Sequence, residues 1–233
     1  MDFTLRFRIK SCGESTMKFR IMFVYLQKIT IFLLFLIYLS CEIQADEDEP
    51  GTYRDLTEAL QNSLDVRILI LSEQKLTTLP KEIEQLKNLQ MLDLCYNQFK
   101  TVPKKIEQLK NLQVLNLSSN QLITLPKEIG KLENLQVLNL GSNRLKTLPK
   151  GIEQLKNLQT LYLNYNQLTT LPREIGRLQS LTELHLQHNQ IATLPDEIIQ
   201  LQNLRKLTLY ENPIPPQELD KIRKLLPNCE IRF

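Results

Sequence analysis

The sequence has few of the residues and motifs on which catalysis and metal binding usually depend. Its 233 residues include only two histidines, and no nucleophile elbow, phosphate-binding loop or closely spaced cysteine pair occurs. His185 and His188, with Glu183 and Glu211 nearby, are residue types that bind zinc, but their spacing on a strand is not that of a metal site. We therefore expect no catalytic residue, no metal and no cofactor, and a protein that is not an enzyme.

The chain after residue 45 also lacks a net charge. The formal charge of +3 comes from residues 1–45, where six basic residues stand against three acidic ones. Residues 46–233 hold 23 basic and 23 acidic residues. A nucleic-acid-binding surface usually carries a basic excess, so we expect no nucleic-acid partner.

Long apolar runs are scarce, and the most prominent one lies near the N-terminus. Basic residues precede the run ITIFLLFLIYLSC, from Ile29 to Cys41, and a short polar stretch then ends at Ala45. The run is shorter than the about 20 residues that span a bilayer, and the small Ala45 suits a signal peptidase. We predict a signal peptide over residues 1–45, cleaved near Ala45, which exports the mature protein.

Two other interpretations of this leader remain open. If the apolar residues from Ile21 to Leu26 extend the run, the leader stays in place as a membrane anchor. If Cys41 is acylated, the protein is a lipoprotein. In all three cases the remainder is exported, to become secreted, periplasmic or outer-membrane associated, and only an uncleaved leader or acylated Cys41 joins it to a membrane.

Most of the remaining chain repeats one unit of 23 residues. Seven units begin at Val66, Leu89, Leu112, Leu135, Leu158, Leu181 and Leu204. An asparagine recurs with the same spacing, at Asn97, Asn120, Asn143, Asn166, Asn189 and Asn212. Sustained repetition at such a period is typical of a solenoid.

Each unit predicts a short strand followed by about one turn of helix. In the third unit, Leu115 and Leu117 alternate with residues that point away from them, as expected for a strand with one buried face. A Leu-Pro pair then turns the chain, and Ile129 and Leu132 follow at helical spacing.

The periodic asparagines are expected to be structural. After each strand the backbone must bend inside the solenoid, where unpaired N–H and C=O groups are costly to bury. An asparagine amide offers both donors and an acceptor on a short stem, so stacked copies can satisfy neighbouring loops. Gln74 takes this position in the first unit, and a weaker match is expected at the end of a repeat array.

The pattern LxxLxLxxNxL followed by xxLPxxIxxLxN resembles the leucine-rich repeat family. The resemblance implies an α/β fold, a curved right-handed horseshoe with a concave parallel sheet and short helices on its convex side. The uniform units with LPKEI and the leader are most similar to exported leucine-rich repeat proteins of pathogenic spirochaetes. This implies a non-enzymatic module that binds a host surface, matrix or serum protein.

A second interpretation is an intracellular leucine-rich repeat scaffold. The LPxEI units also resemble those of proteins that bind small GTPases or other signalling proteins. This interpretation requires that the leader is a mispredicted start. A mature N-terminus near Asp46 in an exported fraction would distinguish the two.

Both ends of the array need caps, because an open solenoid would expose its core and sheet edges. Residues 46–65 are expected to form the N-terminal cap, with Tyr53, Leu56, Leu60 and Leu64 on one face of a helix over residues 52–64. The repeats are expected over residues 66–226, where the last unit merges into a C-terminal cap helix. Residues 227–233 then add a terminal strand.

The strand residues that point away from the core form the predicted concave face, where we expect the partner. In the first half these side chains are small, apolar or amide-bearing, whereas the second half collects rings. Such rings are enriched at binding hot spots, although aromatics also pack well across exposed strands. We predict a monomer that binds a protein partner through Tyr162, Tyr165, His185, His188 and Tyr210.

Overall fold

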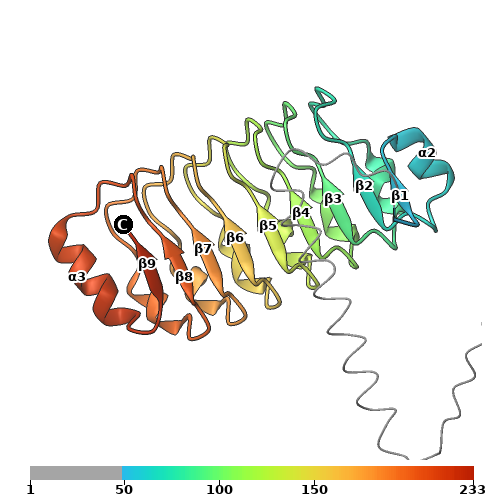
Figure 1. Cartoon of the computed structure of the whole chain (residues 1–233). Helices are drawn as coiled ribbons and strands as arrows, with labels where there is room; N and C mark the ends of the chain where they lie inside the picture. Colours follow the sequence, from blue (N-terminus) through green and yellow to red (C-terminus); the bar gives the residue numbers. More distant parts are fainter. Residues whose placement is uncertain (1–48) are drawn as a thin grey trace, which may run out of the picture. The chain divides into compact units, whose positions relative to one another are not determined.

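Each repeat contributes one short strand to a single parallel sheet. The computed structural model describes residues 49–233, so the leader, with Cys41 and Ala45, lies outside the described residues. Within these, strands β1 to β9 lie side by side in chain order (Figure 1). Their bounds are β1 Thr52–Tyr53, β2 Ile68–Ile70, β3 Met91–Asp93, β4 Val114–Asn116, β5 Val137–Asn139, β6 Thr160–Tyr162, β7 Glu183–His185, β8 Lys206–Thr208 and β9 Glu230–Arg232.

The register of the sheet follows the repeat. Leu92 lies opposite Leu115, and Leu115 lies opposite Leu138, so residues 23 positions apart become neighbours on adjacent strands. The same pairing continues through Leu161 and Leu184. Equivalent residues therefore form columns that run across the sheet.

A short 3-10 helix follows each of β2 to β7. In the third unit Pro126 has φ −68° and ψ 146°, and the N–H groups of Ile129 and Leu132 donate to the carbonyls three residues earlier. The sequence predicted a helical turn here, and the spacing of three residues makes it 3-10 helical. These helices are η1 Lys81–Gln85, η2 Lys104–Gln108, η3 Lys127–Lys131, η4 Lys150–Gln154, η5 Arg173–Arg177 and η6 Asp196–Gln200.

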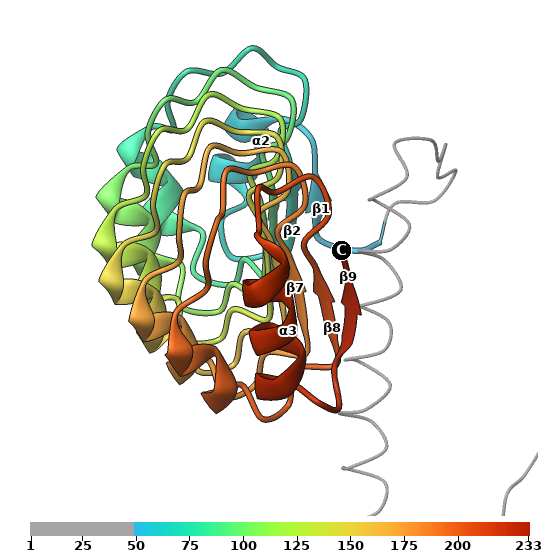
Figure 2. The ribbon, with the colours of Figure 1, turned by 90° about the vertical axis from the view of Figure 1, so that its left-hand side faces the viewer.

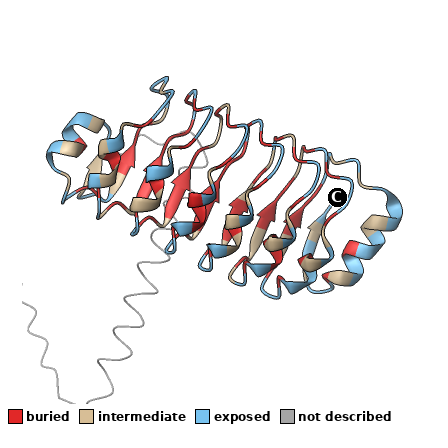
Figure 3. Cartoon of the chain, turned by 180° about the vertical axis from the view of Figure 1, so that it is seen from behind, coloured by how far each residue is buried: buried red, intermediate tan, exposed pale blue. Residues whose placement is uncertain are grey.

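The hydrophobic core lies between the sheet and the row of 3-10 helices. Figure 2 shows the strands along one side and the 3-10 helices along the other. Leu115 and Leu117 from a strand, with Ile129 and Leu132 from the helical side, are fully buried, and each unit repeats this arrangement. Buried residues consequently run along the strands of successive units, as Figure 3 shows.

The periodic asparagines join neighbouring turns. Asn143 Oδ1 accepts the N–H of Leu122 at 2.9 Å, and its Nδ2 donates to the carbonyls of Leu117 at 2.9 Å and Leu140 at 3.1 Å. Equivalent bonds are made by Asn97, Asn120, Asn166, Asn189 and Asn212. In the first unit, Gln74 Nε2 donates to the Arg54 carbonyl of the N-terminal segment at 2.9 Å.

A second row of asparagines, which the sequence analysis did not identify, joins the units on the other side of the strands. Asn111 Nδ2 donates to the Lys87 carbonyl, and Asn134 Nδ2 donates to the Lys110 carbonyl, both at 2.8 Å. The same bond occurs at Asn88, Asn157 and Asn203. Most units are therefore linked by an asparagine before the strand and another after it.

The N-terminal end differs from the helix predicted over residues 52–64. Thr52 and Tyr53 form β1, and the helix is the shorter α2, Leu56–Gln61, whose N-cap Asp55 accepts the N–H of Glu58 at 2.8 Å. Tyr53 thus belongs to a strand, and Leu64 exposes 74% of its surface. The prediction was wrong at these positions because Asp55 favours the start of a helix and the preceding residues can extend the sheet.

The C-terminal end is covered by a longer helix. Helix α3, Pro216–Leu225, buries Ile222 against the core, and β9 pairs with β8 beyond it. Within residues 49–233, no helix is both long enough and apolar enough to cross a membrane.

Candidate functional site

In the first half of the concave face, polar side chains form hydrogen bonds within their own units. Asn116 Oδ1 accepts the N–H of Ser118 at 3.1 Å and its hydroxyl hydrogen at 2.8 Å. Asn139 and Asp93 accept the N–H groups of Gly141 at 3.0 Å and Cys95 at 2.9 Å. All three acceptors are buried, as is their neighbour Val114. These positions support the backbone of their own units.

Asp93 is the buried carboxyl group of this first half. Burial raises the pKa of Asp93 above its ordinary value, while hydrogen bonds from Cys95 act in the opposite direction. The group is therefore held among amide side chains at a cost to its charged form.

In the second half, Tyr162 and His185 lie opposite each other on β6 and β7. Their rings stack with centroids 4.6 Å apart and planes inclined by 12°. His185 exposes only 7% of its surface and Tyr162 is half-buried. Burial, with a smaller effect of Glu183, raises the pKa of Tyr162 to about 12, so its phenol stays neutral. The prediction that both rings are exposed on the concave face was wrong for His185, which is buried.

Three rings lie together on the loops that follow β6, β7 and β8, and we name Tyr165, His188 and Tyr210 the aromatic strip. Tyr165 stacks on His188 at 4.2 Å between centroids, and His188 meets Tyr210 edge-on at 5.4 Å. Tyr165 exposes 52% of its surface and Tyr210 exposes 39%. The aromatic strip therefore offers more accessible ring surface than the Tyr162–His185 pair.

The backbone at this turn has an unusual conformation in every unit. Tyr165 and His188 have φ of 54° and 55°, in the left-handed region that side chains rarely adopt. Tyr96 occupies the equivalent position in the first half with φ 52° and 53% exposure. The turn thus projects a large ring from both halves, but only in the second half is it stacked on another ring at the next unit.

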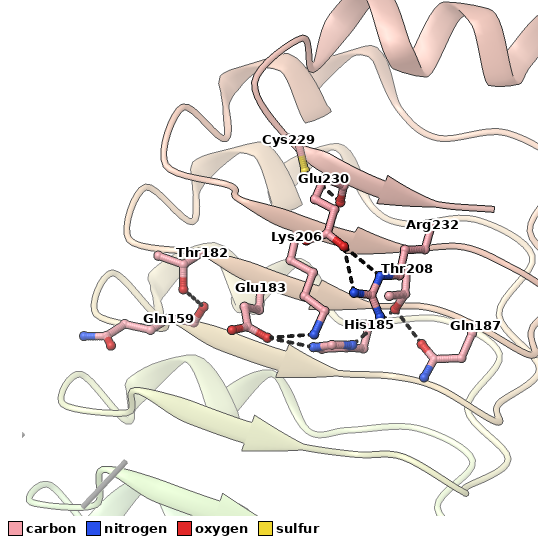
Figure 4. A network of polar contacts seen from close by, with 10 residues as sticks. All are labelled: Gln159, Thr182, Glu183, His185, Gln187, Lys206, Thr208, Cys229, Glu230 and Arg232. Atoms are coloured by element: carbon pink, nitrogen blue, oxygen red, sulfur yellow. Dashed lines mark hydrogen bonds and ion pairs between the residues drawn. The ribbon is translucent and has the colours of Figure 1, made fainter. Parts of the chain in front are cut away.

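Charged side chains surround His185 and are paired with each other. Figure 4 shows the Glu183 carboxylate facing both His185 and Lys206, and Arg232 beside Glu230. Glu183 Oε2 lies 3.1 Å from His185 Nε2 and 3.8 Å from Lys206 Nζ. The pairs leave β7 to β9 without a strong charge of either sign.

A polar chain continues from the other side of the His185 ring (Figure 4). His185 Nδ1 lies 3.2 Å from Thr208 Oγ1, and the Thr208 hydroxyl donates to Gln187 Oε1 at 2.7 Å. Burial lowers the pKa of His185, and Glu183 acts against this by raising it. The sequence analysis missed this chain, although the spacing of 23 residues between His185 and Thr208 was a usable signal.

The predicted site gives no support to metal chemistry. Among residues 49–233, no group of three or more His, Cys, Asp or Glu side chains is placed to hold a metal ion. The two nitrogens of His185 face Glu183 and Thr208, and the ring of His188 packs against Tyr165 and Tyr210. The two histidines thus belong to different contacts.

On the convex side, oppositely charged residues of successive units pair with each other. Glu84 binds Lys105 of the next unit at 2.7 Å, and Lys131 binds Glu107 of the preceding unit at the same distance. Arg177 makes a similar pair with Glu153 at 2.6 Å. Several of the exposed charges on this side therefore already have partners.

Comparison with known protein families agrees with the architecture. The family model described as leucine rich repeat matches residues 65–122, 111–168, 133–191 and 156–214. The chain therefore belongs to the leucine-rich repeat family, whose repeats are typically protein-interaction modules without enzymatic activity. No curated protein matches the chain.

Two solved structures are similar to this chain. A leucine-rich repeat protein of Leptospira interrogans is 40% identical with a TM-score of 0.49, and the match covers 77% of this chain and 57% of that one. The plant peptide hormone receptor RGFR1, solved in complex with RGF2, is 32% identical with a TM-score of 0.60; the match covers 78% of this chain and 30% of that one. This chain thus matches only part of either protein.

Proposed function

We propose that this protein is an exported, monomeric binding module that holds a protein partner against the second half of its concave face. The carrying observation is the aromatic strip, in which Tyr165 and Tyr210 expose 52% and 39% of their surfaces beside half-buried His188. Large amphipathic rings supply contact area and lose little rotamer entropy on binding. Tyr162 and His185 form a second stacked pair on the adjoining strands β6 and β7.

The mutual stacking of the rings supports this choice of surface. A ring that is already fixed by a neighbour has little freedom left to lose when a partner covers it. The first half offers only Tyr96 as an exposed ring on the same turn, because the next units carry Ser119 and Ser142 there. The convex side offers ion pairs between exposed side chains, which contribute little to specific binding.

Export and a host partner are part of the same proposal. They rest on the leader sequence and on the resemblance to exported spirochaete proteins with 23-residue repeats. The peptide hormone receptor RGFR1, part of which is similar to this chain, was solved in complex with RGF2, which is consistent with a binding role. N-terminal sequencing of the protein from an exported fraction should give a start at Asp46. An intact leader would indicate a membrane anchor, and a cytoplasmic protein that begins after the leader would favour the scaffold interpretation.

A binding panel tests the proposed surface. The purified protein is immobilised and exposed to individual serum and extracellular-matrix proteins, with small GTPases as the competing class. For the protein that binds, replacing Tyr165 and Tyr210 together with Ala should weaken the affinity about 30-fold, roughly 2 kcal/mol.

Tyr96→Ala is the matched control, because Tyr96 has the same turn conformation and the same exposure in the first half. Its affinity should stay within about twofold of the unchanged protein. An equal loss in Tyr96→Ala would move the site to the first half. Loss on Lys131→Glu, which reverses a convex charge, would place it on the opposite side.

A further inference from the structure

The hydrogen bonds around His185 show which atoms must donate and which must accept. A carboxylate only accepts hydrogen bonds, and a threonine hydroxyl has a single hydrogen to donate. The Thr208 hydroxyl gives that hydrogen to Gln187 Oε1 at 2.7 Å, so toward His185 Nδ1, 3.2 Å away, it can only accept. His185 Nε2 faces the Glu183 carboxylate at 3.1 Å and must also donate. Both ring nitrogens then carry hydrogen, and the imidazole is charged.

When the ring is neutral, the hydrogen bonds that join Gln187, Thr208 and His185 must reverse their donors and acceptors. Neutral imidazole has one N–H, and Glu183 retains it at Nε2, which leaves Nδ1 as an acceptor. The Thr208 hydroxyl then has to turn its hydrogen toward Nδ1, and its oxygen has to accept from Gln187. Gln187 can donate only through Nε2, so its carboxamide must rotate by about half a turn. The two ends of a carboxamide have nearly the same shape, so this rotation needs no repacking.

We propose that His185, Thr208 and Gln187 form a proton-controlled switch that changes the hydrogen-bonding character of the concave face. When His185 is charged, Gln187 binds Thr208 through its oxygen and presents its amide hydrogens outward. When His185 is neutral, Gln187 binds through its nitrogen and presents its oxygen. Gln187 is half-buried, and while its carboxamide oxygen faces Thr208 its nitrogen points away from Thr208 (Figure 4).

The groups that face His185 determine which state prevails. Glu183 on β7 favours the charged ring, whereas burial and the positive charges of Lys206 on β8 and Arg232 on β9 oppose it. Tyr162 on β6 covers one face of the ring as a neutral phenol. Burial, with Lys206 and Arg232, outweighs Glu183 and holds the pKa of His185 below its ordinary value, so the switch operates on the acid side of that value.

The switch itself needs no partner, and its use in choosing a partner rests on the proposed function. When His185 is charged, Gln187 would favour a partner that offers a hydrogen-bond acceptor. When His185 is neutral, Gln187 would favour a partner that offers a donor. If no protein binds the concave face, the proposed function fails while the switch can still be measured in the isolated protein.

Nuclear magnetic resonance on the labelled protein tests the switch. The side-chain amide of Gln187, assigned with a Gln187→Met variant, is followed against pH together with the ring of His185. We expect both to titrate with one midpoint. In Thr208→Val, which keeps the shape but lacks the hydroxyl, His185 should still titrate and the Gln187 response should be lost. Thr208→Ser should restore it.

Control variants show whether the Gln187 response passes through Thr208 or arises only because Gln187 lies near a histidine. His188→Gln removes the other histidine and should leave the Gln187 titration unchanged. If the Val variant does not fold, Thr208→Ala provides the same comparison. The proposal would be overturned if the Gln187 amide signals did not change as His185 titrates. It would also be overturned if they changed equally in variants that lack the Thr208 hydroxyl.

Discussion

The two halves of the concave face share one backbone but use their side chains differently. Across β3 to β5, Asp93, Asn116 and Asn139 bond to backbone N–H groups of their own unit. Across β6 to β8, the side chains reach the next strand, as Tyr162 does to His185 and His185 does to Thr208. Asn116 on the next strand also hydrogen-bonds the Asp93 side chain, whereas in the second half rings of neighbouring units stack on each other. The first half is thus held mainly by bonds from polar side chains to their own backbone, and the second half by ring contacts between units.

Each half of the concave face contains a buried titratable group, and burial shifts the pKa values of these two groups in opposite directions. Burial raises the pKa of Asp93 and lowers that of His185, because in both cases it disfavours the charged form. Burial therefore acts against the ionised form of Asp93 and in favour of the neutral form of His185. Four predictions test how far the halves differ, in decreasing order of the expected effect.

The largest effect is expected where the halves are alike, in the asparagine row. Asn143→Ala removes a buried side chain that satisfies backbone groups of two units, and unfolding in denaturant should show a loss of about 1 to 3 kcal/mol. Asn212 makes the same bonds but is only half-buried beside α3, so Asn212→Ala should cost less. Equal losses would argue against a burial-dependent row.

The second prediction converts Asp93 to the residue that its column carries in the next two units. Because its folded-state pKa is raised, Asp93 contributes stability at pH values below its unfolded pKa, and this contribution is lost as pH rises through the folded pKa. Asp93→Asn should therefore raise stability at pH 7 by an amount on the order of 1 kcal/mol and change little in acid. Thermal unfolding at several pH values measures the difference, and a destabilised variant at pH 7 would contradict it.

The third prediction measures the ring stack against an equivalent ring outside the aromatic strip. Tyr96→Gly relieves the left-handed backbone and should raise the unfolding free energy by about 0.5 to 1 kcal/mol. Tyr165→Gly gains the same relief but loses the stack on His188, worth about 0.5 to 1 kcal/mol, so its stability should hardly change. Equal gains in the two variants would show that the stack contributes nothing.

The smallest effect is expected at His185. Its folded-state pKa is lowered, so its contribution is present above the unfolded pKa and is lost as pH falls through the folded pKa. The stability difference between the unchanged protein and His185→Gln should therefore shift against the unchanged protein in acid. Denaturant midpoints compared at pH 7 and at mildly acidic pH give the sign, and the reverse trend would show that Glu183 outweighs burial.

Much of the architecture could be predicted because every unit repeats the same local pattern. The spacing of Leu115 and Leu117 indicated the strand, Ile129 and Leu132 indicated the helical side, and Asn143 indicated a turn that needs hydrogen bonds. The N-terminal segment could not be predicted as well, because it occurs once and its leucines fit a helix and a sheet edge equally. There Asp55 decided where α2 begins.

The candidate site was predictable in its residue types but not in its exposure. Tyr165, His188 and Tyr210 do gather in one strip, but His185 is buried against Tyr162, and the chain through Thr208 to Gln187 was not foreseen. Burial on an open sheet depends on the side chains one unit away on both flanks. A local pattern within one strand cannot supply that information.

The sequence by itself determined the period, the inward leucines and the asparagine row that includes Asn143, because these follow from the needs of one backbone turn repeated every 23 residues. Only the tertiary structure decided which outward side chains remain accessible and how hydrogen bonds connect His185 through Thr208 to Gln187. Those properties arise where Tyr162, His185 and Thr208 become neighbours across three strands, in contacts that depend on ring orientation and on a few ångströms of separation.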